Sequence, residues 1–295
     1  MTTPSVSKNF LKPLVIPESP NVDIVAVHGL NPTNAEFHAE ATWTAEDKLW
    51  LKDFLPSKLP KARILLFGYN SNVAFETSIA GVREQAVNLL NRLTSKRGDA
   101  GDRPIIFVAH SLGGIIVKRA LVEAKLDDSY KAIRDATYGI AFFGTPHQGG
   151  NFARLGDIAA SIVRGVCRSP MNTFMEALKK DSLFSDTLVD DFRHQLEDYH
   201  VLSFYETLPM GRLGLIVDKR SATLGLAGVR ERQIPMEADH NSVCKFASAE
   251  GDAYEQVSFN LVGLVTSAVA AAAERERIAS SRAPSSNVLP QAACK

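Results

Sequence analysis

Ser111 is the residue in this sequence best placed to act as a nucleophile, because it stands where an apolar strand meets a helix. The surrounding segment reads Pro104-Ile105-Ile106-Phe107-Val108-Ala109-His110-Ser111-Leu112-Gly113-Gly114. Uncharged β-forming residues are typical of a central parallel strand, and small residues after the serine allow a helix to pack closely. The pattern G-x-S-x-G, with Ala109 at the first small position, predicts a nucleophile elbow rather than an ordinary strand-to-helix turn. The Ser111 hydroxyl would attack a carbonyl carbon while the Leu112 N–H faces the developing oxyanion.

A serine hydroxyl is a weak nucleophile, so a base must take its proton and an acid must orient that base. In an elbow enzyme the acid and then the histidine follow the serine along the chain. His240, in the segment Glu237-Ala238-Asp239-His240-Asn241-Ser242, fits this order; the alternative is a surface-loop histidine. Because the base must be neutral, we expect activity to rise through roughly pH 6 to 7.

The acid has two candidates, because two carboxylates stand at the ends of expected strands before the histidine. Glu206 follows the run His200 to Tyr205, and Asp218 follows the run Leu213 to Val217. Glu206 is favoured because it ends the strand that comes after the insertion, where this arrangement usually carries its acid. Asp218 remains the alternate acid, with a strand-end turn as its other interpretation, and Asp239 ranks third.

Further residues near the expected site have supporting roles. The residues His28, Gly29 and Leu30 come directly after the first expected strand. The backbone N–H of Leu30 is the candidate second oxyanion donor. His28 is expected to shape that loop. The segment from Gly144 to Gly150, with His147, is expected to shape the pocket floor, and Lys118 is interpreted as a structural or surface cation.

Strand and helix patterns alternate along the chain, which predicts an α/β fold with a doubly wound, mostly parallel sheet. Expected strands cover residues 22–27, 63–67, 105–109, 138–143, 200–205 and 213–217, and expected helices cover residues 44–55, 79–93 and 115–126.

The chain divides into an irregular segment at 1–20, a domain at 21–277 and a disordered tail at 278–295. Within the domain, residues 151–199 carry apolar residues at helical spacing and are expected to form a helical cap over the carboxyl edge of the sheet. Its helices either cover the substrate or only add packing. The uncharged stretch 257–273 is short for a bilayer span and is expected to be a helix buried against the sheet.

Composition narrows the class of protein. In 295 residues, 45% are hydrophobic, and Lys plus Arg balance Asp plus Glu at 33 each, so no charge field favours nucleic acid. The cysteines, Cys167, Cys244 and Cys294, are odd in number and widely spaced, which suits a reducing compartment. Residues 1–20 lack a secretory signal. We therefore expect an intracellular protein, cytoplasmic or associated with an organelle membrane.

With these residues assembled, the chain resembles the lipase-like serine esterase family of the α/β hydrolase superfamily. The motifs are Val27-His28-Gly29-Leu30, Phe67-Gly68-Tyr69, Ala109 to Gly114 with Lys118, Phe143 to His147, Phe204 to Pro209, Ser221-Ala222, and Asp239-His240 with Cys244-Lys245. It is similar to eukaryotic serine-active-site phospholipid-remodelling proteins and to esterase domains of fungal NACHT and ankyrin receptor-like proteins. The resemblance implies an α/β hydrolase fold and places Glu206 on the acidic strand end. The chain departs from the family pattern at Arg220, where related chains often carry an acidic residue.

These observations predict a serine hydrolase that cleaves a carboxylic ester, of a lipid or a small molecule, through an acyl-enzyme. No metal or cofactor is expected, and peripheral membrane contact is compatible with a lipid substrate. The alternatives are a thioesterase or acyltransferase of a biosynthetic pathway, and a signalling or interaction module built on the hydrolase fold.

Overall fold

A seven-stranded sheet forms the centre of the protein in this computed structural model, which describes residues 9–33, 35–71, 79–98, 100–147, 158, 160–164, 192 and 195–282. The strand order is β1-β5-β2-β6-β7-β8-β9. All neighbours run parallel except β1, which pairs antiparallel with β5, so the expected mostly parallel sheet is confirmed. The strands are β1 (Phe10–Val15), β2 (Val22–Val27), β5 (Ala62–Gly68), β6 (Ile105–His110), β7 (Thr137–Phe143), β8 (His200–Glu206) and β9 (Glu231–Met236).

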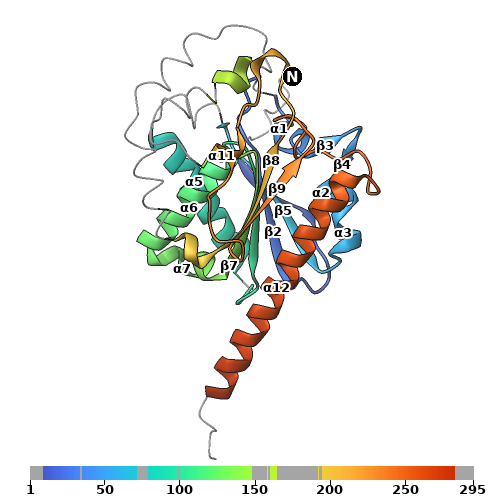
Figure 1. Cartoon of the computed structure of the whole chain (residues 1–295). Helices are drawn as coiled ribbons and strands as arrows, with labels where there is room; N and C mark the ends of the chain where they lie inside the picture. Colours follow the sequence, from blue (N-terminus) through green and yellow to red (C-terminus); the bar gives the residue numbers. More distant parts are fainter. Residues whose placement is uncertain are drawn as a thin grey trace, which may run out of the picture.

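Helices cover both faces of the sheet, as Figure 1 shows. One face carries α5 (Ile79–Lys96), α6 (Gly113–Leu126) and α7 (Lys131–Ala136), and the other carries α2 (Trp50–Asp53), α3 (Leu55–Lys58) and α12 (Asp252–Arg282). Alternate residues of β2 therefore enter two different cores: Val25 and Val27 on the first face, Ile24 and Ala26 on the second. A strand buried on both faces needs an unbroken apolar sequence, which explains the runs recognised above. Shorter elements are α1 (His38–Ala41), β3 (Thr44–Ala45), β4 (Lys48–Leu49) and α11 (Lys219–Ala222).

The register brings the carboxyl ends of the central strands to one rim. His110 pairs with Phe143, Phe143 with Phe204, and Glu206 with Met236. The residues that follow these positions therefore start from the same edge of the sheet. The chain leaves β2 toward β5 on one side and returns to β6 on the other, and open α/β sheets bind their ligands at such a switch point.

Two expectations about strands are wrong. Residues 1–20 are not irregular throughout, because Phe10–Val15 forms β1; Pro13 is tolerated there because an edge strand can lack one N–H donor. The run Leu213 to Val217 is not a strand: a 3₁₀ turn at Gly211–Leu213 is followed by Gly214, whose φ of 74° breaks extended structure. The last strand of the sheet is β9 instead, a polar segment that sequence patterning does not single out.

The expected helix at 44–55 is also corrected. Glu46 and Asp47 have φ of 47° and 64°, which turns the chain into the small β3–β4 hairpin before α2 and α3 begin. Trp43 and Trp50 are fully buried on this side of the sheet. The hairpin thus fixes two large aromatic side chains beside the loop that leads from β2.

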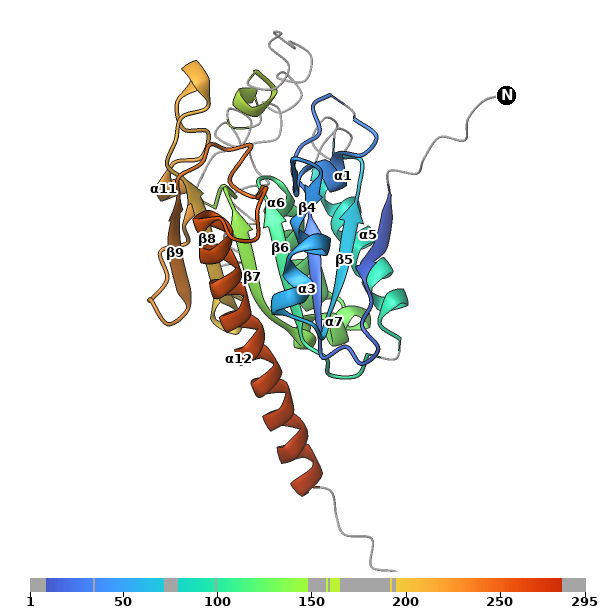
Figure 2. The same ribbon diagram turned by 90° about the vertical axis from the view of Figure 1, so that its right-hand side faces the viewer.

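Helix α12 extends beyond the end of the expected domain and continues to Arg282, inside the stretch predicted to be disordered. Its length and apolar composition would suffice to cross a membrane, yet Tyr254, Val257, Leu261 and Leu264 are buried against the sheet. Figure 2 shows its last turns projecting from the body. Residues 283–295 and most of the expected cap lie outside the described residues.

Candidate active site

Ser111 occupies a strained corner directly after β6. Its φ of 53° lies in the left-handed region, which costs a non-glycine residue about 1–2 kcal/mol. Three hydrogen bonds hold the corner: the Ser111 N–H donates to Phe143 O (2.8 Å), and the Ser111 carbonyl accepts from Thr145 Oγ1 (3.0 Å) and the Gly114 N–H (3.1 Å). Each bond contributes about 0.5–1.5 kcal/mol, so together they offset the strain. The main chain, not the serine side chain, maintains the elbow.

Two glycines are required because the elbow touches the loop after β2. A Cβ on Gly113 would stand 2.3 Å from His28 O and 2.6 Å from Val27 O, which are backbone atoms that cannot move aside cheaply. A Cβ on Gly29 would stand 2.9 Å from the Ser111 Cβ. The start of α6 therefore packs directly on the chain that leaves β2.

Ser111, His240 and Glu206 form one continuous hydrogen-bonded chain. His240 Nε2 lies 2.8 Å from Ser111 Oγ, and His240 Nδ1 lies 2.8 Å from Glu206 Oε2. All three residues are buried. The second carboxylate oxygen, Glu206 Oε1, accepts the Val217 N–H at 2.7 Å. Both carboxylate oxygens are thus occupied, and the imidazole is held with Nε2 toward the hydroxyl.

The other carboxylates do not contact the imidazole. Asp218 is exposed and caps α11, where its Oδ1 accepts the Ser221 N–H at 2.8 Å. Asp239 accepts the N–H groups of Asn241 and Ser242 in its own turn. Asp218 is therefore the wrong choice geometrically, and the reason is that Leu213 to Val217 does not run as a strand toward the rim.

Gly144 leaves room for the imidazole. Its φ is 53°, and a Cβ built there would lie 3.2 Å from His240 Nδ1 and 3.8 Å from Glu206 Oε2. The segment after β7 thus shapes the site through its backbone.

His110 fixes the backbone of His240, a contact that the sequence analysis missed. Its Nε2–H donates to the His240 carbonyl at 2.9 Å. Burial lowers the pKa of His110 well below its ordinary value, and the nearby His240 and Lys245 act in the same direction. A neutral His110 is therefore a fixed donor, and its position directly before the nucleophile was the available signal.

Leu30 and Leu112 border the nucleophile with backbone N–H groups that have no hydrogen-bond partner in the part of the chain that the structure describes. Leu112 is the N-cap of α6, where N–H groups are free for a ligand.

His28 fixes the loop that carries Leu30. Its Nδ1–H donates to Gly29 O (2.7 Å), and its Nε2 accepts the Tyr69 N–H (3.2 Å). Burial lowers the pKa of His28 to about 3, so the ring is neutral in this role. His28 shapes the loop, as expected from the sequence.

A cavity of about 150 Å³ is lined by Ser111 and His240. An apolar cavity of this size holds a group about as large as benzene. Its described lining is apolar at Leu30, Pro32, Ala41, Ile162 and Met210, and polar at Thr33, His38, Thr42, His110, Asn241 and Lys245. Ile162 belongs to the expected cap segment, of which residues 160–164 are helical. Most of the other residues expected to form the cap lie outside the described residues.

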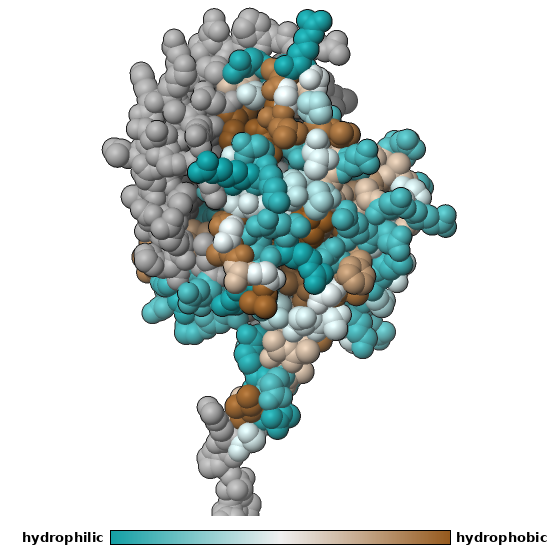
Figure 3. Space-filling view, in the orientation of Figure 1, coloured by the Kyte–Doolittle hydropathy of each residue, from teal (hydrophilic) through white to brown (hydrophobic). Residues whose placement is uncertain are grey.

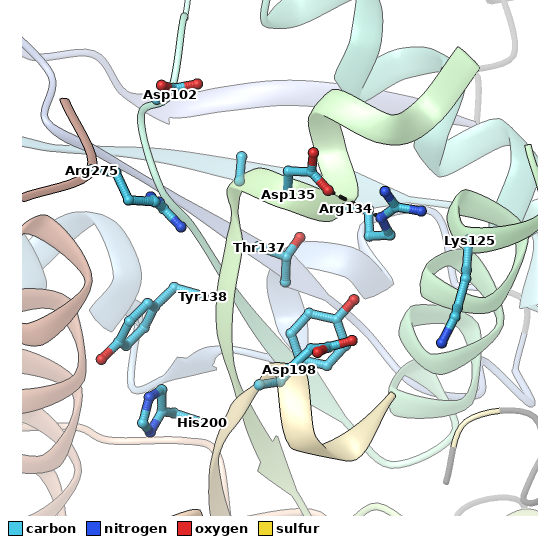
Figure 4. A pocket seen from close by; sticks show the side chains of 11 residues that line it. Asp102, Lys125, Arg134, Asp135, Thr137, Tyr138, Asp198, His200 and Arg275 are labelled. Atoms are coloured by element: carbon cyan, nitrogen blue, oxygen red, sulfur yellow. Dashed lines mark hydrogen bonds and ion pairs between the residues drawn. The ribbon is translucent and has the colours of Figure 1, made fainter. Parts of the chain in front are cut away.

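A larger cavity, of about 760 Å³, lies at the opposite edge of the sheet. Thr137 and His200, which begin β7 and β8, line it together with Arg275 of α12, as Figure 4 shows. Because Ser111 stands at the carboxyl edge, this cavity cannot receive a substrate for it. Within the described residues, no cluster of His, Cys, Asp or Glu is arranged to hold a metal ion.

Lys118 is not a surface cation, because it is buried on α6. Its Nζ lies 3.4 Å from His147 Nδ1, and burial lowers the pKa of Lys118 to about 7. His147 is also buried, its Nε2 has no hydrogen-bond partner among the residues that the structure describes, and its backbone N–H donates to Ser221 O. The pair joins α6 to the segments before the cap and after β8, which agrees with a shaping role for His147.

Comparison with known proteins shows the family to which part of the chain belongs and the class of its fold. The family described as "Putative serine esterase (DUF676)" matches residues 20–164, which include the elbow. That part of the chain belongs to this family. Protein SERAC1 of Mus musculus is 31% identical over 216 residues, which cover 70% of this chain and 32% of the relative. SERAC1 of Bos taurus is 29% identical over 262 residues, which cover 79% of this chain and 38% of the relative. The matched part of the chain therefore spans 32% to 38% of the length of these relatives.

Solved structures establish the fold class. The mature lipase BlEst2 of Bacillus licheniformis aligns with a TM-score of 0.53 at 18% identity, covering 87% of this chain and 99% of that one. A fungal esterase of Rhizomucor miehei aligns with a TM-score of 0.50 at 11% identity, covering 86% and 76%. The chain has the α/β hydrolase fold.

Proposed function

We propose that this member of the serine esterase family hydrolyses carboxylic esters through a covalent acyl-enzyme. One observation carries the proposal: the unbroken chain of 2.8 Å contacts from Ser111 Oγ through the His240 ring to Glu206. A buried carboxylate on Nδ1 fixes the imidazole tautomer whose Nε2 accepts the hydroxyl proton.

In acylation, the Ser111 oxygen attacks the ester carbonyl carbon as His240 Nε2 takes the hydroxyl proton. The carbonyl oxygen becomes an oxyanion, which the N–H groups of Leu30 and Leu112 stabilise. When the tetrahedral intermediate collapses, the imidazolium returns the proton to the leaving alcohol. A water molecule then repeats the sequence on the acyl-enzyme, releasing the acid and restoring Ser111.

The surface around the site favours an ester with an apolar part. The loop after β8 exposes Leu208, Leu213 and Leu215, and Met210 of the same loop lines the catalytic cavity. Figure 3 shows hydrophobic atoms gathered at this end of the molecule. A lipid ester, approached through peripheral contact with a membrane, would place its acyl chain against these side chains.

Substitution of the nucleophile tests the proposal. Ser111→Ala should abolish labelling by a fluorophosphonate probe and lower kcat by at least ~10³ on p-nitrophenyl esters. A panel with acyl thioesters and alcohol acceptors would distinguish hydrolysis of esters from thioester cleavage and acyl transfer. Undiminished labelling of Ser111→Ala would remove the serine from the mechanism.

A further inference from the structure

We propose that Lys245 forms an anion-binding subsite at the catalytic cavity, so that the preferred esters carry a carboxylate or phosphate group close to the scissile bond. This inference rests on the proposed esterase function and names its substrate class. It concerns a residue to which the triad mechanism gives no task.

Lys245 supplies an isolated positive charge to the cavity. Among the described lining residues it is the only Lys or Arg, and no Asp or Glu is present. Its neighbours His38 and His110 are neutral: burial, followed by the charge of Lys245, lowers the pKa of His38 to about 4, and burial likewise lowers the pKa of His110. The field of Lys245 therefore reaches into the cavity without an opposing charge on its described wall.

The ammonium group has no carboxylate partner in the described part of the chain. Its one recorded contact is neutral, a hydrogen bond from Nζ to Asn241 Oδ1 at 3.2 Å. The ion pairs of the described residues do not include Lys245. An ammonium has three donors, so this contact orients the group and leaves donors for a ligand.

The backbone that carries Lys245 is anchored on both sides. Cys244 is buried; its carbonyl accepts Trp50 Nε1–H at 2.9 Å, and its thiol donates to Thr42 O. Phe246 packs edge-on against Trp50 at 5.4 Å. The backbone of Lys245 is thus held in place five residues after His240, so only the side chain of the lysine has to be ordered when an anion binds.

The other residues that line the cavity complete the proposed specificity. Apolar residues such as Ile162 and Met210 suit a hydrocarbon chain, whereas Lys245 stands with Asn241 and Thr42 among the polar residues. Lys245 lines the same cavity of about 150 Å³ as Ser111 and His240, so an anion bound by Lys245 within this cavity would lie close to the ester bond. Carboxylate and phosphate share the charge and the acceptor oxygens that an ammonium recognises.

Paired substrates test the inference. The carboxylate arm compares p-nitrophenyl hemisuccinate with p-nitrophenyl pentanoate; the phosphate arm compares 1-butyrylglycerol 3-phosphate with 1-butyrylglycerol. The measured quantity is the ratio of kcat/KM for the anionic ester to that for its neutral partner. Lys245→Met keeps the length of the side chain and removes the charge. Lys58→Met, on the exposed face of α3, is the matched control.

If Lys245→Met lowers this kcat/KM ratio fivefold or more in either arm, while Lys58→Met leaves it unchanged, the subsite is supported. We expect a fall of about tenfold, which corresponds to the loss of a charge-assisted hydrogen bond. Lys245→Arg should retain most of the ratio. Smaller falls in both arms overturn the inference while leaving esterase activity intact. If the wild type cleaves none of the esters, the esterase proposal fails instead. The subsite is then judged on Ser111→Ala protein: Lys245→Met must weaken calorimetric binding of methyl hemisuccinate fivefold, or the inference is overturned.

Discussion

Replacing Glu206 by glutamine would reverse the orientation of the proton on His240. In the wild type, Glu206 Oε1 accepts the Val217 N–H and Oε2 accepts His240 Nδ1–H. A glutamine amide has only one oxygen, and the Val217 N–H requires it. The NH₂ group then faces Nδ1, which must accept, so the ring proton moves to Nε2 and points at the Ser111 hydroxyl. A base with its proton in that position cannot accept another.

The structure sets the size of the effect. Turning the amide around would restore the active tautomer but leave the buried Val217 N–H without an acceptor, at a cost of about 1–3 kcal/mol. That cost makes the productive arrangement about 5- to 150-fold rarer. Loss of the negative charge beside the imidazolium adds to it. The equivalent acid-to-amide change in serine proteases lowers kcat by about 10⁴-fold. We expect Glu206→Gln to lower kcat by ~10² to ~10⁴.

The assay measures kcat with p-nitrophenyl butyrate alongside urea unfolding, so that loss of activity is separated from loss of structure. Asp218→Asn is the matched control, because asparagine caps a helix about as well as aspartate and Asp218 does not reach the ring. Its kcat should stay within about threefold of the wild type. If Glu206→Gln keeps kcat within tenfold of the wild-type value, the tautomer argument is refuted.

Two further predictions concern stability. Gly113→Ala should lower the free energy of unfolding in urea by at least ~3 kcal/mol, because the added Cβ would meet two backbone oxygens. Gly263→Ala in α12 is the control: no atom lies within 4 Å of the added Cβ, so this change should raise the free energy of unfolding by about 0.5–1 kcal/mol. Equal effects of the two changes would contradict the contact argument. In the folded protein the pKa of Lys118 is lowered to about 7, whereas the ordinary value for a lysine, which applies to the unfolded chain, is 10.5. Between pH 7 and pH 10.5 the unfolded state therefore binds more protons than the folded state, so the stability of the wild type rises with pH over this range. The stability advantage of Lys118→Met over the wild type should therefore be greater at pH 7 than at pH 10, and a difference independent of pH would show that Lys118 is not desolvated.

Local patterns predicted the elbow well, because β6, Ser111 and the glycines are consecutive and each requirement is visible in the residue types. His240 followed from chain order alone. The acid stayed ambiguous because it depended on whether Leu213 to Val217 runs as a strand, and an apolar run does not reveal that Gly214 interrupts it. The polar β9, with Pro235 tolerated at the sheet edge, gave no strand signal.

Contacts between distant segments could not be predicted in the same way. Lys118 looks like an ordinary helix cation until the segment carrying His147, 29 residues later, closes over it. The bond from His110 to the carbonyl of His240 spans 130 positions, and although His110 stands directly before the nucleophile, the sequence does not show which distant residue it contacts. Burial and unpaired charge are properties of the assembled fold, which is why the role proposed for Lys245 emerges only from the cavity.

The corner after β6 keeps its shape through peptide groups, since Phe143, Thr145 and Gly114 bind the N–H and carbonyl of residue 111 and leave the hydroxyl free for His240. The variant Ser111→Ala should consequently keep the shape of the catalytic cavity but be inactive. This variant protein could be incubated with a total cellular extract and recovered under native conditions. It would retain uncleaved substrate, which mass spectrometry would then identify without an assumption about its chemistry.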